Sequence, residues 1–261
     1  MLNLINNLNI RKKLALLLIM PFSSLFFFAG LNLYTQYLTH QEAKSSIEYL
    51  ELTTQIADLI HSVQQERGIT AGYLGSSRTN FIVQLDNQRR QTDIKLAQVS
   101  YLLSPLMHDQ IVANKIKILM SFTNEREQLR LAVDSGNLQA VGQLSYTHYT
   151  KGLNLLLSLS DVLQTRINND VIARSNESLH ALLYLQEYAG QERALLNKVF
   201  FSNDVSLSEL TSINTTITLQ DEMLNSFYKT AAPKFSQRLK SDLASAEIQK
   251  FLDIRISAIN K

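Results

Sequence analysis

The sequence predicts an all-α protein in which an N-terminal transmembrane helix is followed by two stacked antiparallel four-helix bundles. The first observation is composition, because only three prolines and eight glycines interrupt 261 residues, of which 45% are hydrophobic. So few breaks favour long helices. The second is the recurrence of apolar residues at three- and four-residue steps, with no period-two run that would indicate a strand. The third is an uncharged segment near the N-terminus.

This uncharged segment, LALLLIMPFSSLFFFAGLNLY, covers residues 14–34 and follows three basic residues at positions 11–13. At 1.5 Å per residue, a helix of this length crosses a hydrocarbon core of about 30 Å. The basic cluster predicts a cytoplasmic tail at 1–13, a transmembrane helix at 14–36 and export of residues 37–261. A cleaved signal peptide is the competing interpretation, but its apolar region is normally about 7 to 15 residues long and ends at a small-residue cleavage site.

Beyond this segment, turn and capping residues divide the chain into helices. The apolar spacing continues the first helix to Gly75, where GSSRTN supplies turn and N-cap residues. Pro105 ends the next helix, because the residue before a proline is pushed out of the helical conformation. The following helix ends at DSGN, a strong turn sequence. The expected helices are 80–103, 107–133, 138–173 with or without a kink, 175–201 and 206–230, with one or two more after Pro233.

Composition and motifs argue against several function classes. The net charge is only +2, and no basic run with interleaved aromatics indicates a nucleic-acid partner. The absence of cysteine excludes disulfides, zinc-thiolate sites and thiol catalysis. Five histidines are scattered without ligand spacing, and no nucleophile, kinase or Gly-rich nucleotide motif is present. We therefore expect no enzymatic activity, no metal and no cofactor.

A Gln-Glu-Arg triplet occurs twice, in HSVQQERGITAGYLGS at 61–76 and in EYAGQERALLNKVF at 187–200, so that a shift of 126 positions places Arg67 on Arg193. Each arginine belongs to a helix stripe of amides and small residues. The stripes are Ile60, Gln64, Arg67 and Ala71, and Gln186, Gly190, Arg193 and Asn197. The glutamate beside each arginine lies about 100° around the helix and is expected to point elsewhere.

Two interpretations of these arginines remain open at this stage. If the stripes face the interior, each guanidinium needs a partner, and a small planar oxyanion matches its fork. Otherwise the arginines lie on solvated faces or pair with acids from other helices. The glycines near Arg67 favour close helix packing, since they match no phosphate-binding loop.

The two triplet segments resemble the signatures of the nitrate- and nitrite-sensing (NIT) domain of bacterial receptors and transcription antiterminators. YTHYTKGLNLLLSLSDVL and FLDIRISAI also fit, so the resemblance covers about residues 50–258. It implies two four-helix bundles in which arginines on different helices bind nitrate or nitrite. The matching arginines are Arg67, Arg193 and Arg255. The family often carries a small aromatic or tryptophan-containing element before the third arginine, and here Phe251 stands in a chain without tryptophan.

This resemblance implies a sensor in the bacterial inner membrane, with residues 37–261 as a periplasmic NIT-type domain. The expected ligand-binding residues are Arg67, Arg193 and Arg255 together with Gln64, Gly68, Gln186 and Gly190. We expect a parallel homodimer that packs along residues 43–63 and signals through a downstream domain or protein that this sequence does not contain. The output remains open between a chemotaxis receptor, a histidine kinase and a cyclic-dinucleotide enzyme. The alternative function is a helical adaptor or scaffold that binds a protein partner and no small molecule.

Overall fold

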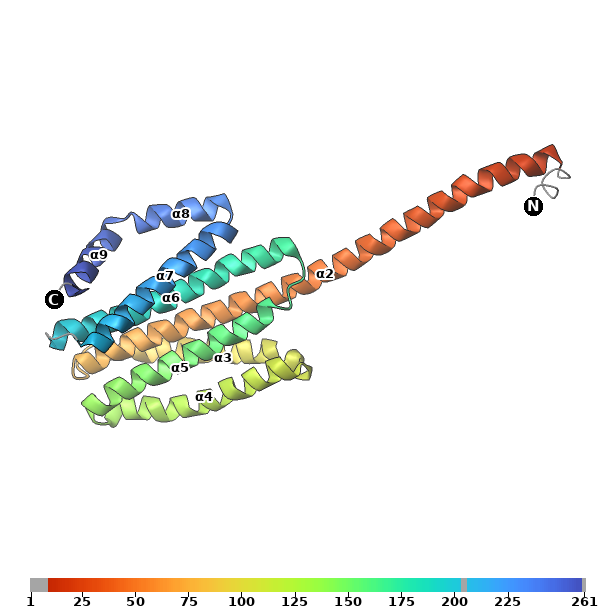
Figure 1. Cartoon of the computed structure of the whole chain (residues 1–261). Helices are drawn as coiled ribbons and strands as arrows, with labels where there is room; N and C mark the ends of the chain where they lie inside the picture. Colours follow the sequence, from red (N-terminus) through yellow and green to blue (C-terminus); the bar gives the residue numbers. More distant parts are fainter. Residues whose placement is uncertain (1–8, 203–205, 260–261) are drawn as a thin grey trace. The chain divides into compact units, whose positions relative to one another are not determined.

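A computed structural model describes residues 9–202 and 206–259, and every regular element within them is helical (Figure 1). The all-α prediction is therefore confirmed. The chain divides into two compact units, one up to Ser45 and the other from Ser46 onward. Helix α2, Ile10–Gly75, contributes residues to both units.

The first unit consists of the N-terminal part of α2, and its apolar side chains are exposed. Met20 is 79% exposed and Phe26 is 74% exposed. Pro21 lies inside the helix, and the hydroxyl groups of Ser23 and Ser24 donate hydrogen bonds to nearby backbone carbonyls. Among the described residues, α2 is the one helix with the length and composition needed to cross a membrane.

The second unit contains the rest of α2 and all later elements. These are α3 (Ile82–Leu103), the short 3-10 helix η1 (Ser104–His108), α4 (Gln110–Ser135), α5 (Leu138–Gln164), α6 (Asp170–Ser202), α7 (Leu207–Thr230), α8 (Pro233–Leu243) and α9 (Ala246–Ile259). The end of α2 at Gly75 and both bounds of α7 agree closely with the sequence prediction.

The prediction of one helix over 138–173 is wrong. Helix α5 ends at Gln164, and α6 begins at Asp170. The side chain of Asn169 accepts hydrogen bonds from the backbone N–H groups of Val171 and Ile172, both at 3.2 Å. Asn169 therefore acts as the N-cap of α6, a role that its short polar side chain favours over a position inside a helix.

Helices α2 to α5 pair as antiparallel neighbours in chain order, which is the connectivity of an up-and-down bundle. The contacts that join successive helices are Ser62–Thr92, Asp93–Arg130 and Phe122–His148. The core between these helices is aliphatic, and its fully buried members include Ile56, Leu59, Ile60, Leu153 and Leu157. Burial of these side chains is the main driving force for the bundle.

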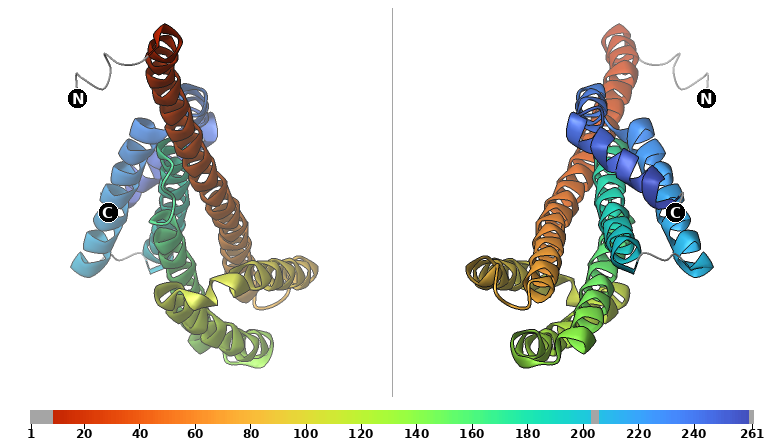
Figure 2. Two further views of the ribbon diagram at one scale, coloured as in Figure 1. Left: turned by 90° about the vertical axis from the view of Figure 1, so that its right-hand side faces the viewer. Right: turned by 90° about the vertical axis from the view of Figure 1, so that its left-hand side faces the viewer.

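Helix α6 lies beside α2 and runs in the same direction, and α7 turns back along α6 (Figures 1 and 2). Within this unit, α3 to α5 lie on one side of the α2–α6 pair and α7 to α9 on the other (Figure 1). Glu192 of α6 joins this second group by accepting hydrogen bonds from Gln220 of α7 and Arg255 of α9. The stacking of two complete four-helix bundles stays a prediction.

Candidate functional site

The parallel course of α2 and α6 brings the two Gln-Glu-Arg triplets together. Contacts between these helices join residues at nearly constant separations in sequence. They are Gln64–Glu187 with a separation of 123, Arg67–Glu187 with 120 and His61–Gln186 with 125. Ser46 of α2 also contacts Asn168, 122 positions further on, in the connection just before α6. The triplets are 126 positions apart, so they lie at the same level of neighbouring helices.

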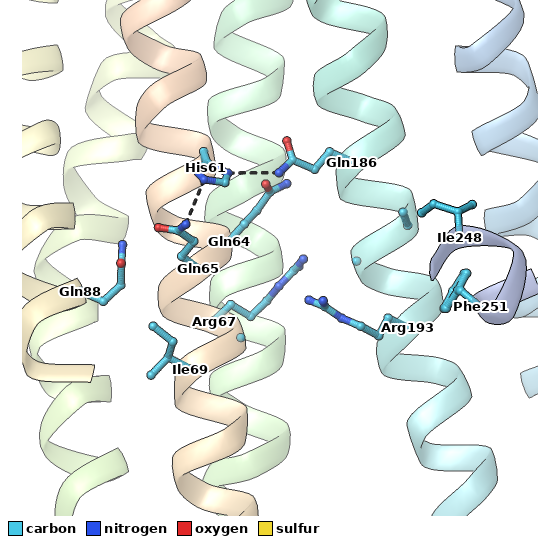
Figure 3. Close-up of a pocket in the computed structure, with 13 residues that line it drawn as sticks. His61, Gln64, Gln65, Arg67, Ile69, Gln88, Gln186, Arg193, Ile248 and Phe251 are labelled. Atoms are coloured by element: carbon cyan, nitrogen blue, oxygen red, sulfur yellow. Dashed lines mark hydrogen bonds between the residues drawn. The ribbon is translucent and has the colours of Figure 1, made fainter. Parts of the chain in front are cut away.

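A cleft of about 760 Å³ lies at this level. Helices α2, α3, α6 and α9 contribute its lining, which consists of His61, Gln64, Gln65, Arg67, Gly68, Ile69, Gln88, Gln186, Ala189, Gly190, Arg193, Ile248 and Phe251. Six of the seven residues expected from the sequence line it, and the exception is Arg255. Figure 3 shows the side chains of Arg67 and Arg193 pointing toward one another from α2 and α6.

Arg67 is buried and paired with a carboxylate. Its Nη1 donates to Oε1 of Glu187 at 2.8 Å, and its Nη2 donates to Oε2 at 3.1 Å. Nη1 also donates to the hydroxyl of Thr150 at 3.1 Å. These contacts use three of the five donors of a guanidinium and leave two for a ligand. The partner of Arg67 is thus an acidic residue from another helix, which is the second of the two interpretations of the sequence.

The Glu187 carboxylate is held on both oxygens. Besides the two bonds from Arg67, it accepts hydrogen bonds from Nε2 of Gln64 at 3.1 Å and from Nε2 of Gln191 at 2.9 Å. Its side chain is fully buried. Four donors satisfy an ionised carboxylate, so the pair is a stable part of the helix contact and Glu187 has no free acceptor position.

Arg193 differs from Arg67 because its side chain is exposed and forms no ion pair or hydrogen bond with any described residue. Its Nη2 atom lies 4.0 Å from the position that a Cβ atom on Gly68 would occupy. Arg193 therefore lines the cleft beside a glycine of the opposite helix, and no described residue uses its donors.

Gly190, the second glycine of the cleft, lies on α6 against Arg67 of α2. A Cβ atom on Gly190 would lie 2.8 Å from Nη2 of Arg67, which is closer than nonbonded atoms pack. Each arginine is thus placed against a glycine of the neighbouring helix, Arg67 against Gly190 and Arg193 against Gly68. Gly190 makes room for the guanidinium of Arg67, whereas a Cβ atom on Gly68 would be in ordinary contact with Arg193.

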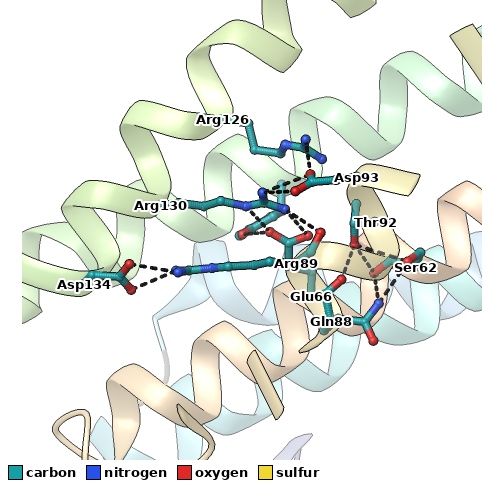
Figure 4. A network of polar contacts seen from close by, with 10 residues as sticks. Ser62, Glu66, Gln88, Arg89, Thr92, Asp93, Arg126, Arg130 and Asp134 are labelled. Atoms are coloured by element: carbon teal, nitrogen blue, oxygen red, sulfur yellow. Dashed lines mark hydrogen bonds and ion pairs between the residues drawn. The ribbon is translucent and has the colours of Figure 1, made fainter. Parts of the chain in front are cut away.

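Both triplet glutamates point away from their own arginines, as expected. Glu66 is fully buried, accepts hydrogen bonds from Arg130 at 2.8 and 2.9 Å, and accepts another from the hydroxyl of Tyr149 at 2.8 Å. Figure 4 shows how Asp93 and Arg126 extend this network. Burial lowers the pKa of Arg130, but hydrogen bonds to Glu66 and Asp93 outweigh this effect and raise it above its ordinary value. The network fixes the face of α2 opposite to the cleft.

Glu192 is the counterpart of Glu66 on α6. It is fully buried and accepts hydrogen bonds from both Arg255 and Gln220. The Arg255 guanidinium also lies over the ring of Phe251, 5.6 Å from its centroid. Arg255 is therefore engaged beside the cleft, where it orients α9, while Phe251 provides the lining.

Sequence reasoning missed Glu187, which neutralises Arg67, and Gln191, which donates a hydrogen bond to Glu187. They stand in the second signature, but no local pattern marks them as partners of α2. Their role follows only once α2 and α6 are known to run in parallel, because residue 67 then faces the stretch that contains position 187.

The family profile described as NIT, nitrate and nitrite sensing, matches residues 58–261. The chain belongs to this family. The resemblance carried by the two signatures is thus confirmed, and both NIT signatures lie on the cleft.

A solved structure of the NasR transcription antiterminator is similar to the chain with a TM-score of 0.75. The alignment covers 87% of this chain and 61% of the NasR chain at 22% sequence identity. A likeness at this identity shows a shared fold. A comparison with curated protein sequences finds no match.

Proposed function

We propose that the chain is a membrane-anchored sensor that binds nitrate or nitrite in the cleft between α2 and α6. The observation that carries this proposal is the position of Arg193, a cation without a partner among the described residues, which faces a second arginine across a cleft formed by the two NIT signatures. A planar monovalent oxyanion suits the guanidinium fork of Arg193. The two remaining donors of Arg67 complete the proposed site.

The other expected residues have separate roles in this proposal. Gly190 leaves space for Arg67, Gly68 lies beside Nη2 of Arg193, and Gln64 donates a hydrogen bond to Glu187. Gln186 hydrogen-bonds His61 at 3.1 Å along the wall of the cleft. Arg255 does not line the cleft, so its proposed role is to hold α9 in place through Glu192.

The binding test is calorimetry on the full chain in detergent micelles, with sodium nitrate, nitrite and chloride compared at one ionic strength. Titration with nitrate or nitrite should give a heat signal that saturates, and titration with chloride should give none. Ligand at a hundredfold excess over its Kd should also stabilise the fold by about 2.7 kcal/mol. Identical melting in all three salts would favour the adaptor alternative.

Membrane anchoring by residues 14–36 is the second part of the proposal. Its support is the exposed apolar surface of the first unit together with the basic residues at positions 11–13. The positive-inside rule then places residues 37–261 in the periplasm of a bacterial inner membrane. An alkaline phosphatase fusion after Lys261 should be active, whereas activity of a cytoplasmic β-galactosidase fusion at the same position would contradict this topology.

The third part is a parallel homodimer along residues 43–63 of α2, which passes the signal to a downstream domain or protein. Helix α2 carries both the cleft residues and the apolar segment, so a ligand that changes the α2–α6 contact acts directly on it. The sequence contains no cysteine, so single cysteines can be introduced. Ile47→Cys, at an exposed position, should cross-link between protomers, and Leu52→Cys, at a buried position, is the control. Absence of cross-linking at both Ile47→Cys and Thr54→Cys would indicate a monomer.

A further inference from the structure

Three charged groups determine the net charge at the proposed anion site. Arg67 and Arg193 line the cleft and contribute two positive charges, and Glu187 contributes one negative charge directly behind Arg67. Arg255 reaches the cleft only through the ring of Phe251, and Glu192 neutralises it. The site therefore carries a net charge of +1.

Glu187 is a fixed part of this charge balance. Its carboxylate is fully buried, and its four hydrogen bonds come from two helices: Gln64 and Arg67 on α2 and Gln191 on its own helix. To leave the site, the carboxylate would have to break two charge-assisted bonds and leave a buried guanidinium unpaired, which is strongly unfavourable. We infer that the negative charge stays in place when an anion enters the cleft.

On this basis we propose that Glu187 determines the valence of the ligand and makes the cleft selective for monovalent anions over divalent ones. This inference rests on the proposed function and adds its selectivity. A nitrate or nitrite ion brings the site to neutrality. A sulfate ion would leave an excess negative charge next to a buried carboxylate, and such an uncompensated charge is unfavourable.

The test compares nitrate and sulfate binding to the full chain in detergent by calorimetry at one ionic strength. In the wild type, sulfate should bind at least about tenfold more weakly than nitrate. Glu187→Gln keeps the size of the side chain and removes its charge. Because sulfate carries twice the charge of nitrate, this variant should shift the sulfate-to-nitrate affinity ratio toward sulfate by about tenfold or more.

Two variants serve as controls. Glu177→Gln removes the same charge from α6 about 15 Å along the helix and should leave the ratio unchanged. Glu187→Asp keeps the charge but shortens the side chain, so it should retain selectivity even where affinity falls.

Comparable affinity of wild-type protein for sulfate and nitrate would overturn the inference, and so would an unchanged ratio in Glu187→Gln or a gain of sulfate binding in Glu187→Asp. The failure of the proposed function is a different result, since the wild type would then bind neither nitrate nor nitrite.

Discussion

Gly190 and Arg67 meet at the contact between α6 and α2, where a Cβ atom on the glycine would lie 2.8 Å from Nη2 of the arginine. The guanidinium cannot move away freely, because its Nη1 donates hydrogen bonds to Glu187 at 2.8 Å and to Thr150 at 3.1 Å. A side chain at position 190 therefore changes the direction in which Arg67 presents its free donors. The corresponding position on α2, Gly68, has no such restriction, since its Cβ would lie 4.0 Å from Arg193.

The difference between these two distances predicts that alanine substitutions at Gly68 and Gly190 have different effects on nitrate binding. Gly68→Ala should raise the unfolding free energy by up to about 1 kcal/mol through helix propensity and retain nitrate binding. Gly190→Ala should weaken nitrate binding by about tenfold, roughly the value of one hydrogen bond to a charged group. Urea unfolding and calorimetry on both variants measure the two effects. Equal nitrate affinity of the two variants would show that the Arg67 position is not critical.

The two arginines are expected to differ in their effect on stability. Arg193→Ala removes an exposed side chain that pairs with no described residue, so the unfolding free energy should change by less than about 0.5 kcal/mol. Arg67→Ala leaves the Glu187 carboxylate buried without its cation and should destabilise the protein by about 3 to 5 kcal/mol.

In binding, Arg193→Ala should weaken nitrate affinity by roughly ten- to a hundredfold, since it removes one or two charge-assisted hydrogen bonds. Arg193→Lys keeps the charge without the fork and should recover affinity only in part. Calorimetric titration of the folded variants measures the expected order of nitrate affinities, in which the wild type binds most tightly, then Arg193→Lys, then Arg193→Ala. If Arg193→Ala binds nitrate like the wild type, the proposed site is incorrect.

The Glu66–Arg130 pair provides a test of the buried network in Figure 4. Arg130→Met leaves the fully buried carboxylate of Glu66 without its bidentate partner and should lower the unfolding free energy by about 3 to 5 kcal/mol. The double variant with Glu66→Gln should recover part of this loss. Arg90→Met is the matched control, because the Arg90–Asp86 pair is exposed and such pairs contribute about 0.3 to 0.5 kcal/mol. A similar loss in Arg130→Met and Arg90→Met would show that the network contributes little to stability.

The burial of His148 predicts a small loss of folding stability at acidic pH. Burial lowers the pKa of its imidazole, which is stacked on the ring of Phe122 at 4.1 Å. The folded-state pKa of His148 lies below the unfolded value near 6.5. At pH values between these two pKa values the unfolded state binds more protons than the folded state, so the stability falls as the pH decreases through this range. The loss should stay below about 1 kcal/mol, since the side chain is only partly buried and solvent screens part of its charge.

The measurement for His148 is the melting temperature of the wild type and of His148→Gln between pH 7 and pH 5. The variant should lose less of its stability over this range, because glutamine does not titrate. His40→Gln, at an exposed position, is the control and should follow the wild type. A steeper pH dependence in His148→Gln than in the wild type would contradict the proposed effect of burial.

Local sequence information was sufficient for most helices and for six of the thirteen residues that line the cleft. Proline, glycine and capping residues end helices through restrictions on their own backbone, so Gly75 and the bounds of α7 could be predicted. The break at Asn169 was missed because asparagine is compatible with both a cap and a polar helix face, and only the neighbouring backbone decides between them. The two family signatures are sufficient to identify Arg67, Arg193 and both glycines, since all four residues stand within them.

The sequence by itself determined that the chain is helical, that it carries an apolar N-terminal segment and that two related triplets recur 126 positions apart. Only the tertiary structure decided which arginine is paired and which is available. Helix periodicity fixes the angle at which a side chain leaves its own helix but not the helix that it meets. The parallel packing of α2 against α6 places Glu187 on Arg67 and leaves Arg193 exposed in the lining of the cleft. The charge at the proposed site therefore depends on the packing of two segments that are distant in sequence, and the residue spacing within either segment does not predict it.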